Sequence, residues 1–533
     1  MFWADELAAS VSGLQVVNDS KTPSGTIHVG ALRGVVIHDA IVRALRDAGH
    51  EVRLLYGIDD LDPMDSATLA TREGVGEFMG RPLAEVPAPR GSDQPTWARH
   101  FAGTFLDTFH RLGVAPELYW ASEQYREGLF DEFVTEALEK AAEVLRVYRE
   151  VAHVRHPDDW LPVMVICESC GRIGTTYATD WNGETVAYAC RPDLVSWATG
   201  CGNAGRVSPF RGRAKLPWNL HWVAKWRLFG VTIEAAGKDL ATAGGSRERS
   251  ETLARDVFGV TPPRNLPYEF LLVGGRKMKS SLGTGTSADA AANLLPAELV
   301  RFLMLRYRPQ ATIEFDPAGT DAIPRLFDEF DRVAAATAGR EVKGELPPDH
   351  ERLFALSLVD PSADVASEAA AYRPAFAHLA LLEQIPGVDV PARIEAEKGS
   401  PLTDREGDLL SERRAAARAW LEGYAPERAR LAVARDGLPE AAAEQLDVAQ
   451  RGYVGDLASA LDVAAWTGES VQAAIFATAT AHELPAGRAF TALYLAFLGR
   501  SSGPRAGWLL AALDREFVVS RLREAAAAAA VQA

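Results

Sequence analysis

The fold is decided by residues 14–30, which read Leu-Gln-Val-Val-Asn-Asp-Ser-Lys-Thr-Pro-Ser-Gly-Thr-Ile-His-Val-Gly. The apolar run at the start predicts a buried strand, and the polar run with proline and glycine that follows predicts a loop. Apolar residues then recur at helical spacing from Val29 to Leu45, and 51–58 predicts a second strand. Strand, glycine-containing loop, helix and strand at this spacing indicate a βαβ unit of a parallel sheet, so we expect a Rossmann-type α/β domain.

The rest of the chain divides by composition. The α/β pattern continues with one interruption, and further strands are predicted at 231–235 and 270–273. A junction rich in Pro and Gly follows, after which Ala, Leu, Arg and Glu predominate at helical spacing almost to the end. The expected parts are the α/β domain over 1–308 with an insert at about 165–206, a junction over 309–348, and an all-α domain over 349–533.

The composition is that of a globular protein, with 24% charged and 47% hydrophobic residues in 533. The formal net charge of −16 argues against indiscriminate nucleic-acid binding. It does not exclude tRNA binding, because an acidic protein can have a local basic face. No apolar run approaches the roughly 20 residues of a membrane span, and the acidic N-terminus lacks the features of a signal peptide. Four cysteines in so long a chain suit a reducing compartment, so we expect a cytoplasmic protein without a membrane partner.

His28 and Gly30 stand where the first strand passes into the first helix. Backbone N–H groups at a helix start favour phosphate, and Gly30 permits close approach of a nucleotide. A histidine there can donate a hydrogen bond to phosphate oxygens as charge develops. A lone histidine at a helix start is more often only a polar N-terminal residue, but this setting favours a catalytic His28. Gly25, in the turn before it, joins Gly30 as a candidate nucleotide contact.

A second candidate for phosphate binding is residues 274–285, Gly-Gly-Arg-Lys-Met-Lys-Ser-Ser-Leu-Gly-Thr-Gly. Taken alone, it reads equally well as a solvated basic loop. Placed after a predicted strand, it suits a mobile loop that closes over a triphosphate and neutralises the departing pyrophosphate. Together with His28 it predicts ATP-dependent activation. The candidate catalytic residues here are Lys277, Lys279, Ser280 and Ser281, and the candidate ATP contacts are Met278 and Lys279.

All four cysteines of the chain lie within the insert, at Cys167, Cys170, Cys190 and Cys201. A Cys-x-x-Cys pair followed by two further cysteines resembles the spacing of a zinc ribbon, although the second pair is not Cys-x-x-Cys. Four thiolates can close a tetrahedral site, and a closed site is structural. The sequence therefore predicts a structural Zn²⁺ in a zinc-ribbon-like insert.

Two further stretches are ambiguous on their own. Trp218, Trp222 and Trp226 recur at i, i+4 and i+8, which is commonly just the apolar face of a helix. The loop from Gly237 to Ser246 contains small residues and a carboxylate, and such a loop can contact ribose or substrate. From it we take Asp239 as a candidate substrate contact, and Gly244 and Gly245 as candidate ATP contacts.

Together these stretches resemble the class I lysyl-tRNA synthetases, a Rossmann-type family of archaea and some bacteria. The resemblance implies adenylation of lysine by ATP with Mg²⁺, transfer to the 3′ end of tRNA(Lys), and a helical anticodon-binding domain at the C-terminus. It places His28 and Gly30 on the family's HIGH-type motif and Lys277 to Ser281 on its KMSKS-type motif. The positions that match its amino-acid pocket are Ser20, Thr22, Trp218 or Trp222, Asp239, Leu240 and Tyr268.

The chain departs from the family pattern at both ATP motifs. Ala31 replaces the His or Asn that ends the HIGH-type motif, and in the mobile loop Lys279 and Leu282 stand where Ser and Lys are usual. Lys279 can supply a cation from a different loop position, because lysine is a flexible point charge. In the amino-acid pocket, Ser20 replaces a Gly and Leu240 replaces a His.

Three functions fit these residues. The first is a lysine–tRNA ligase that uses ATP, lysine and tRNA(Lys), expected as a monomer. The second is a paralogue that activates another amino acid or delivers it to a small molecule, and the third is a weakly catalytic tRNA-binding protein. The helical C-terminal region favours the first and third. The cations and hydroxyls retained between Lys277 and Ser281 favour the first over the third.

Overall fold

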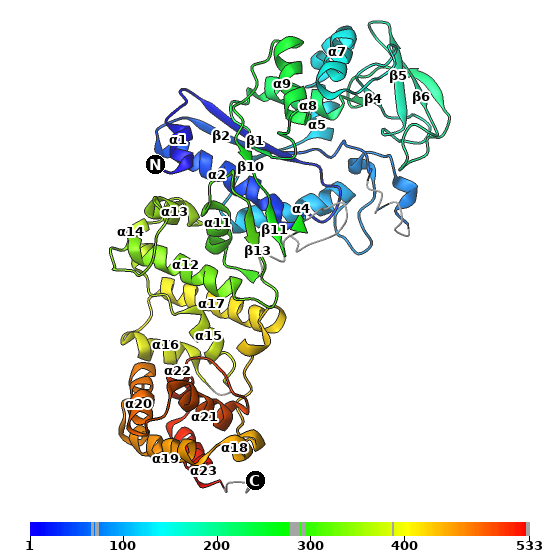
Figure 1. Ribbon diagram of the computed structural model, residues 1–533. Helices are drawn as coiled ribbons and strands as arrows, with labels where there is room; N and C mark the ends of the chain where they lie inside the picture. The colour runs from blue at the N-terminus through cyan, green and yellow to red at the C-terminus, as the bar shows by residue number, and fades with distance from the viewer. Residues whose placement is uncertain are drawn as a thin grey trace. The chain divides into compact units, whose positions relative to one another are not determined.

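The computed structural model describes residues 1–65, 69, 74–274, 276–277, 288, 294–385 and 388–528 (Figure 1). Contacts divide the chain into two compact units. The first comprises 1–315 and 344–365, and the second comprises 316–343 and 366–533. Within the described residues, no helix combines the length and apolar character needed to cross a lipid bilayer.

The first unit is built on a parallel sheet. Its strands are β1 (Gln15–Lys21), β2 (Val52–Ile58) and β3 (Glu117–Trp120), in that order. A short 3-10 turn, η1 (Val29–Ala31), leads into helix α2 (Leu32–Asp47), which connects β1 to β2 and packs against both (Figure 1). The predicted βαβ unit and Rossmann-like sheet are therefore confirmed.

Two other predicted strands have different outcomes. The strand predicted at 231–235 is wrong in extent: only Ile233 forms bridges, to Val17 and to Arg264. The strand predicted at 270–273 is confirmed as β11 (Leu271–Val273), which pairs with β13 (Ile313–Phe315) in parallel and with β12 (Arg276–Lys277) in antiparallel fashion.

Helix α2 is buried on almost every side because the sheet and the neighbouring helices enclose it. Its polar side chains are consequently paired. The Arg33 guanidinium donates to the backbone carbonyls of Glu269 at 2.7 Å and of Ala311 at 2.7 Å, which fixes the helix to the segments around β11 and β13. Asp39 forms ion pairs with Arg43 at 2.8 Å and with Arg301 at 2.7 Å. These bonds fix the start of α2, where the cavity described below opens.

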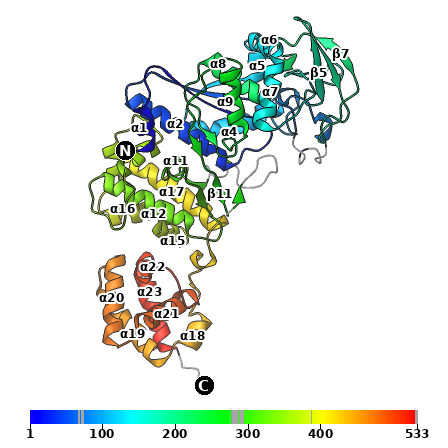
Figure 2. The same ribbon diagram turned by 45° about the horizontal axis from the view of Figure 1, so that its top comes forward.

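The insert consists of small antiparallel sheets. Strands β5 (Thr176–Trp181), β6 (Val186–Cys190) and β7 (Ala204–Val207) form one, and β4 (Met164–Val165) pairs with β8 (Ala214–Lys215). Helices α8 (Trp218–Phe229) and α9 (Ser246–Asp256) lie side by side next to it (Figures 1 and 2). The remaining elements of this unit are α1 (Trp3–Ala8), η2 (Gly76–Phe78), η3 (Leu83–Glu85), α4 (Trp97–Arg111), α5 (Ala121–Arg126), α6 (Asp131–Glu139), α7 (Ala141–Ala152), β9 (Ala236–Gly237), β10 (Pro267–Tyr268), α11 (Ala297–Leu305) and α13 (His350–Ser357).

The described residues of the second unit form helices and their connections, as expected from the sequence. Thr403 and Glu406 form a capping box at the start of its longest helix, and Asp447 and Gln450 form another. The helices are α12 (Ala322–Thr337), α14 (Val365–Ala370), α15 (Phe376–Leu382), α16 (Val390–Lys398), α17 (Asp404–Gly423), η5 (Glu427–Ala429), α18 (Glu440–Gln445), α19 (Val448–Val463), α20 (Gly468–Ala481), α21 (Ala486–Leu498), α22 (Ala506–Ala512) and α23 (Arg515–Ala527).

The two units interleave in sequence between 316 and 365. Phe327 of α12 stacks on Phe376 of α15 at 4.1 Å, so α12 is part of the helical core. Leu356 of α13 accepts from Arg301 of α11, so α13 is part of the α/β unit. The functional domain limits expected from the sequence remain a prediction. In this region, successive segments of the chain belong to the second unit, the first unit and again the second unit.

Candidate functional site

A cavity of about 310 Å³ opens at the carboxyl end of β1, where α2 begins. Parallel α/β sheets commonly bind their ligands at this edge. It is lined from β1, η1, α8 and the segments around β9, β10 and β11. The lining residues are Asp19, Ser20, Lys21, His28, Gly30, Ala31, Tyr56, Trp218, Trp222, Glu234, Ala235, Ala236, Gly237, Asp239, Leu240, Tyr268, Glu269, Phe270 and Leu271.

The cavity brings together many of the residues proposed from sequence. His28 occupies the N-cap of η1 in an extended conformation and lines the cavity together with Gly30. The remaining sequence candidates in the lining are Ser20, Trp218, Trp222, Asp239, Leu240 and Tyr268. Thr22, Gly25, Gly244 and Gly245 are not among the lining residues, and their roles stay predictions.

The tryptophan row on α8 divides between cavity and core. Trp218 and Trp222 line the cavity with ring centroids 4.7 Å apart, whereas Trp226 is buried behind them. The indole N–H groups of Trp222 and Trp226 both donate to Glu234 Oε2 at 2.6 Å. Arg247 lies over the two rings and 3.6 Å from the same carboxylate. The apolar-face interpretation therefore holds for Trp226.

A buried charged network supports the cavity from behind. Lys225 Nζ donates to Ser20 Oγ at 2.9 Å and pairs with Asp59 at 3.1 Å, and both charged side chains are at most 2% exposed. His221 Nε2 donates to the Asp59 carboxylate at 3.2 Å, so Nδ1 of the neutral ring accepts from the Tyr125 hydroxyl at 3.1 Å. Burial lowers the pKa of His221 to about 4. Burial alone would raise the pKa of Asp59, but Lys225 and His221 outweigh it and hold that pKa well below its ordinary value.

A second buried ion pair, between Lys215 and Asp62, holds Thr22, which follows β1. Lys215 Nζ lies 2.7 Å from Asp62 and is almost completely buried. Thr22 Oγ1 donates to the other oxygen of Asp62 at 2.6 Å. Lys225 thus fixes the hydroxyl of Ser20 directly, and Lys215 fixes that of Thr22 through Asp62. Sequence reasoning missed this network because its members are far apart in the chain.

Comparison with known proteins identifies the family. The family described as "tRNA synthetases class I (K)" matches residues 1–359, and one described as "Anticodon binding domain" matches 435–526. The chain belongs to the class I (K) tRNA synthetases. It is 32% identical to Lysine--tRNA ligase 1 of Methanosarcina acetivorans over 98% of both chains. It is also 32% identical to Lysine--tRNA ligase of Archaeoglobus fulgidus, over 98% of this chain and 100% of that one.

In this class I synthetase the second ATP motif is described only at its first residue. The backbone of Lys277 pairs with Leu272 in the β11–β12 hairpin, so the motif follows a strand as predicted. Met278, Lys279, Ser280 and Ser281 lie outside the described residues.

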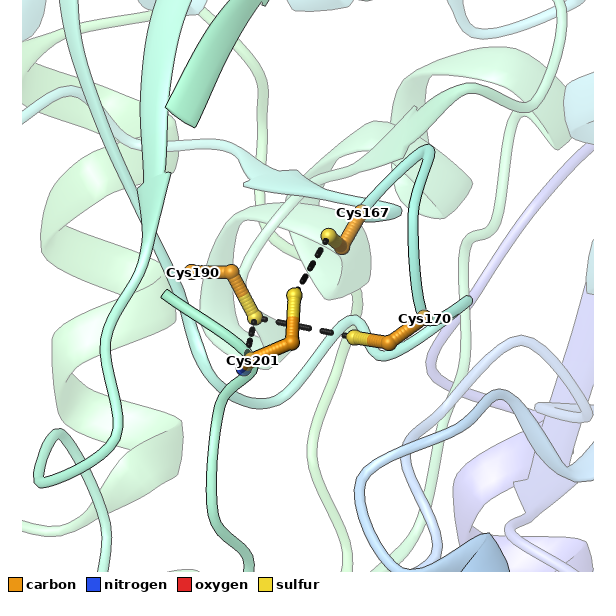
Figure 3. A group of neighbouring side chains, drawn as sticks. All are labelled: Cys167, Cys170, Cys190 and Cys201. Carbon is orange, nitrogen blue, oxygen red and sulfur yellow. Dashed lines mark hydrogen bonds between the residues drawn. The ribbon is translucent and has the colours of Figure 1, made fainter. Parts of the chain in front are cut away.

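The synthetase also brings its four cysteines together (Figure 3). All four sulfur atoms lie within 4.8 Å of one another, and Cys167–Cys201 and Cys170–Cys190 are each 3.7 Å apart. None of the four forms a disulfide. A tetrahedral zinc site with Zn–S bonds of about 2.3 Å places its sulfurs about 3.8 Å apart, so the donor set fits a zinc ion.

Proposed function

We propose that this chain activates lysine with ATP and transfers it to tRNA(Lys). The observation that carries the proposal is the cavity at the carboxyl end of β1. One part of its lining is a helix start suited to phosphate, and another part is a set of aromatic side chains suited to hold the amino acid substrate. Support comes from the full-length similarity to lysine–tRNA ligases and from the helical region that matches an anticodon-binding domain.

The first step joins the two substrates. A carboxylate oxygen of lysine attacks the α-phosphorus of ATP, the bond from that phosphorus to the bridging oxygen breaks, and pyrophosphate leaves with the electron pair. We assign His28 to donate a hydrogen bond to the α-phosphate as charge accumulates, with Gly25, Gly30, Gly244 and Gly245 allowing close backbone approach. Lys277, Lys279, Ser280 and Ser281, with Met278 beside them, are proposed to neutralise and release pyrophosphate. Mg²⁺ would offset the charge of the outer phosphates.

The second step moves lysine to RNA. A terminal hydroxyl oxygen of tRNA attacks the activated carbonyl, the bond from carbon to the phosphate oxygen breaks, and AMP leaves while the hydroxyl proton passes to solvent. We place the amino acid between Trp218, Trp222, Leu240, Asp239 and Tyr268. Ser20 and Thr22, fixed by their bonds to Lys225 and Asp62, shape the loop beside it.

The test is a screen of all standard amino acids for ATP–pyrophosphate exchange, followed by aminoacylation of tRNA(Lys). Lysine should be the amino acid that supports both reactions. Exchange with a different amino acid, or exchange without any transfer to tRNA, would contradict the proposal.

The rearranged loop offers a separate prediction. If Lys279 takes over the charge that Leu282 does not supply, Lys279→Ala should lower the adenylation rate about 100-fold with a smaller effect on the lysine KM, since contact with departing pyrophosphate strengthens in the transition state. Leu282→Lys should restore the rate of that variant. Unchanged single-turnover adenylation in Lys279→Ala would show that Lys277 alone is sufficient.

We also propose that Cys167, Cys170, Cys190 and Cys201 hold one structural Zn²⁺. The purified chain should contain one equivalent of zinc, and a mercurial should release it together with the titration of four thiols. Because the chain has no other cysteine, every reactive thiol reports on this site. Removal of the metal should unfold the insert, because metal binding is coupled to folding in such sites. Absence of zinc together with four reactive thiols in the native chain would contradict the site.

A further inference from the structure

Three of the carboxylates that line the cavity, Glu234, Glu269 and Asp19, differ in how the protein compensates their charge. Glu234 accepts from Asn18 and two indoles and faces Arg247. Glu269 pairs with Lys238 at 2.7 Å. Asp19 is different: among the described residues, its one potentially basic neighbour within ion-pair distance is His38, at 3.5 Å.

His38 does not compensate Asp19, because its ring is already committed. Its Nε2 accepts from the backbone N–H of Ala235 at 3.0 Å, so its proton is on Nδ1. That Nδ1 donates to the carbonyl of Gly34 at 2.7 Å. The imidazole is therefore neutral and its donor is used. Among the residues that the structure describes, Oδ1 of Asp19 accepts a single hydrogen bond, from the neutral N–H of Ser20.

The negative charge of Asp19 is directed into the cavity beside a hydroxyl. The Asp19 side chain retains 19% of its exposure, and Tyr56, its register partner on β2, also lines the cavity. A side chain added at Gly34 would meet Tyr268 Oη at 2.7 Å and Asp19 Oδ2 at 3.3 Å, so both oxygens face the same point. Burial and the nearby charge of Asp19 raise the pKa of Tyr268, which keeps its hydroxyl protonated.

An uncompensated carboxylate, a phenol oxygen and two indole walls in one cavity suit a primary ammonium group on an alkyl chain. We infer that Asp19, assisted by the Tyr268 hydroxyl, binds an ammonium group of the amino acid substrate. This assignment rests on the proposed lysine activation and adds a specificity-determining residue to it. Lysine has two such groups, and the experiment distinguishes them.

The experiment compares Asp19→Asn with the wild-type full chain by calorimetric titration. Asparagine keeps an oxygen for the N–H of Ser20 and removes only the charge. Lysine should bind on the order of 10- to 100-fold more weakly to the variant, with the ATP KM and the melting temperature unchanged. Glu269→Gln is the matched control, because it removes a charge that Lys238 already compensates. The factor by which it weakens lysine binding should be at least tenfold smaller than the factor for Asp19→Asn.

Two analogues complete the cycle. Norleucine lacks the ε-amino group, and 6-aminohexanoate lacks the α-amino group. Wild type should prefer lysine over both, and Asp19→Asn should abolish one preference: over norleucine if Asp19 binds the ε-ammonium, over 6-aminohexanoate if it binds the α-ammonium. Both preferences intact in the variant, or equal weakening for all three ligands, would overturn the inference.

The proposed function fails separately. A wild-type chain that binds lysine without transferring it to tRNA would contradict that function while the Asp19 cycle still gives its answer. A wild-type chain that binds no lysine at millimolar concentration would contradict both.

Discussion

Lys225→Met should destabilise the α/β unit by about 3–5 kcal/mol, because it leaves Asp59 buried without its lysine partner. The same change removes the donor to Ser20 Oγ, so the lysine KM should rise as well. Urea unfolding followed by tryptophan fluorescence measures the first effect. Arg53→Met is the matched control: it breaks an exposed pair with Glu117 in the same unit and should cost less than about 1 kcal/mol.

The destabilisation by Lys225→Met should shrink in acid. In the wild type, the depressed pKa of Asp59 contributes stability that is present above the unfolded pKa of about 4 and is lost below it. In the variant, Asp59 has lost its lysine, and the cost of burying it charged disappears once it is protonated. The two unfolding curves should therefore converge as the pH falls through about 4. A difference that does not change between pH 7 and pH 4 would show that packing, not charge, explains the loss.

His28→Ala should lower the rate of adenylation by about 10²–10³-fold while changing stability little. The residue caps a three-residue turn without a side-chain capping bond, so its removal leaves the backbone supported. Single-turnover formation of the adenylate measures the effect directly. His50→Ala serves as the control, since the His50 ring bonds to the carbonyl of Ala8 and is not among the residues that line the cavity. A folded His28→Ala chain with wild-type kinetics would remove His28 from the catalytic residues.

Local patterns in the sequence were sufficient for the βαβ unit, β11, the helical C-terminal region and the clustering of the cysteines. These features depend on periodicity or on a short motif. The end of β1 could not be predicted in the same way. The apolar pattern stops at Val17 because the last residues of β1 line the cavity, yet backbone pairing with β2 continues to Lys21. Asp19 was therefore interpreted as loop, and its place in the cavity was missed.

Other features depend on partners that no local pattern reveals. Lys225 and Asp59 are 166 residues apart, and Ser20 is 205 residues from the same lysine. The strand predicted at 231–235 was too long, because within it only Ile233 forms β-bridges, to the distant residues Val17 and Arg264. Trp218 and Trp226 share one helix face by spacing, and only the three-dimensional packing separates cavity from core.

The interleaving between 316 and 365 restricts how this gene can be divided or recombined. A fragment that begins at 349 would encode α13, which packs on α11 in the other unit, and would lack α12, whose Asp331 pairs with Arg413 at 2.9 Å. Each half of such a cut would lose part of its own core and carry a piece of the other. An autonomous helical module requires 316–343 spliced to 366–528. Because the chain changes unit at three places, an exchange of the helical unit between synthetases would need three crossovers in place of one.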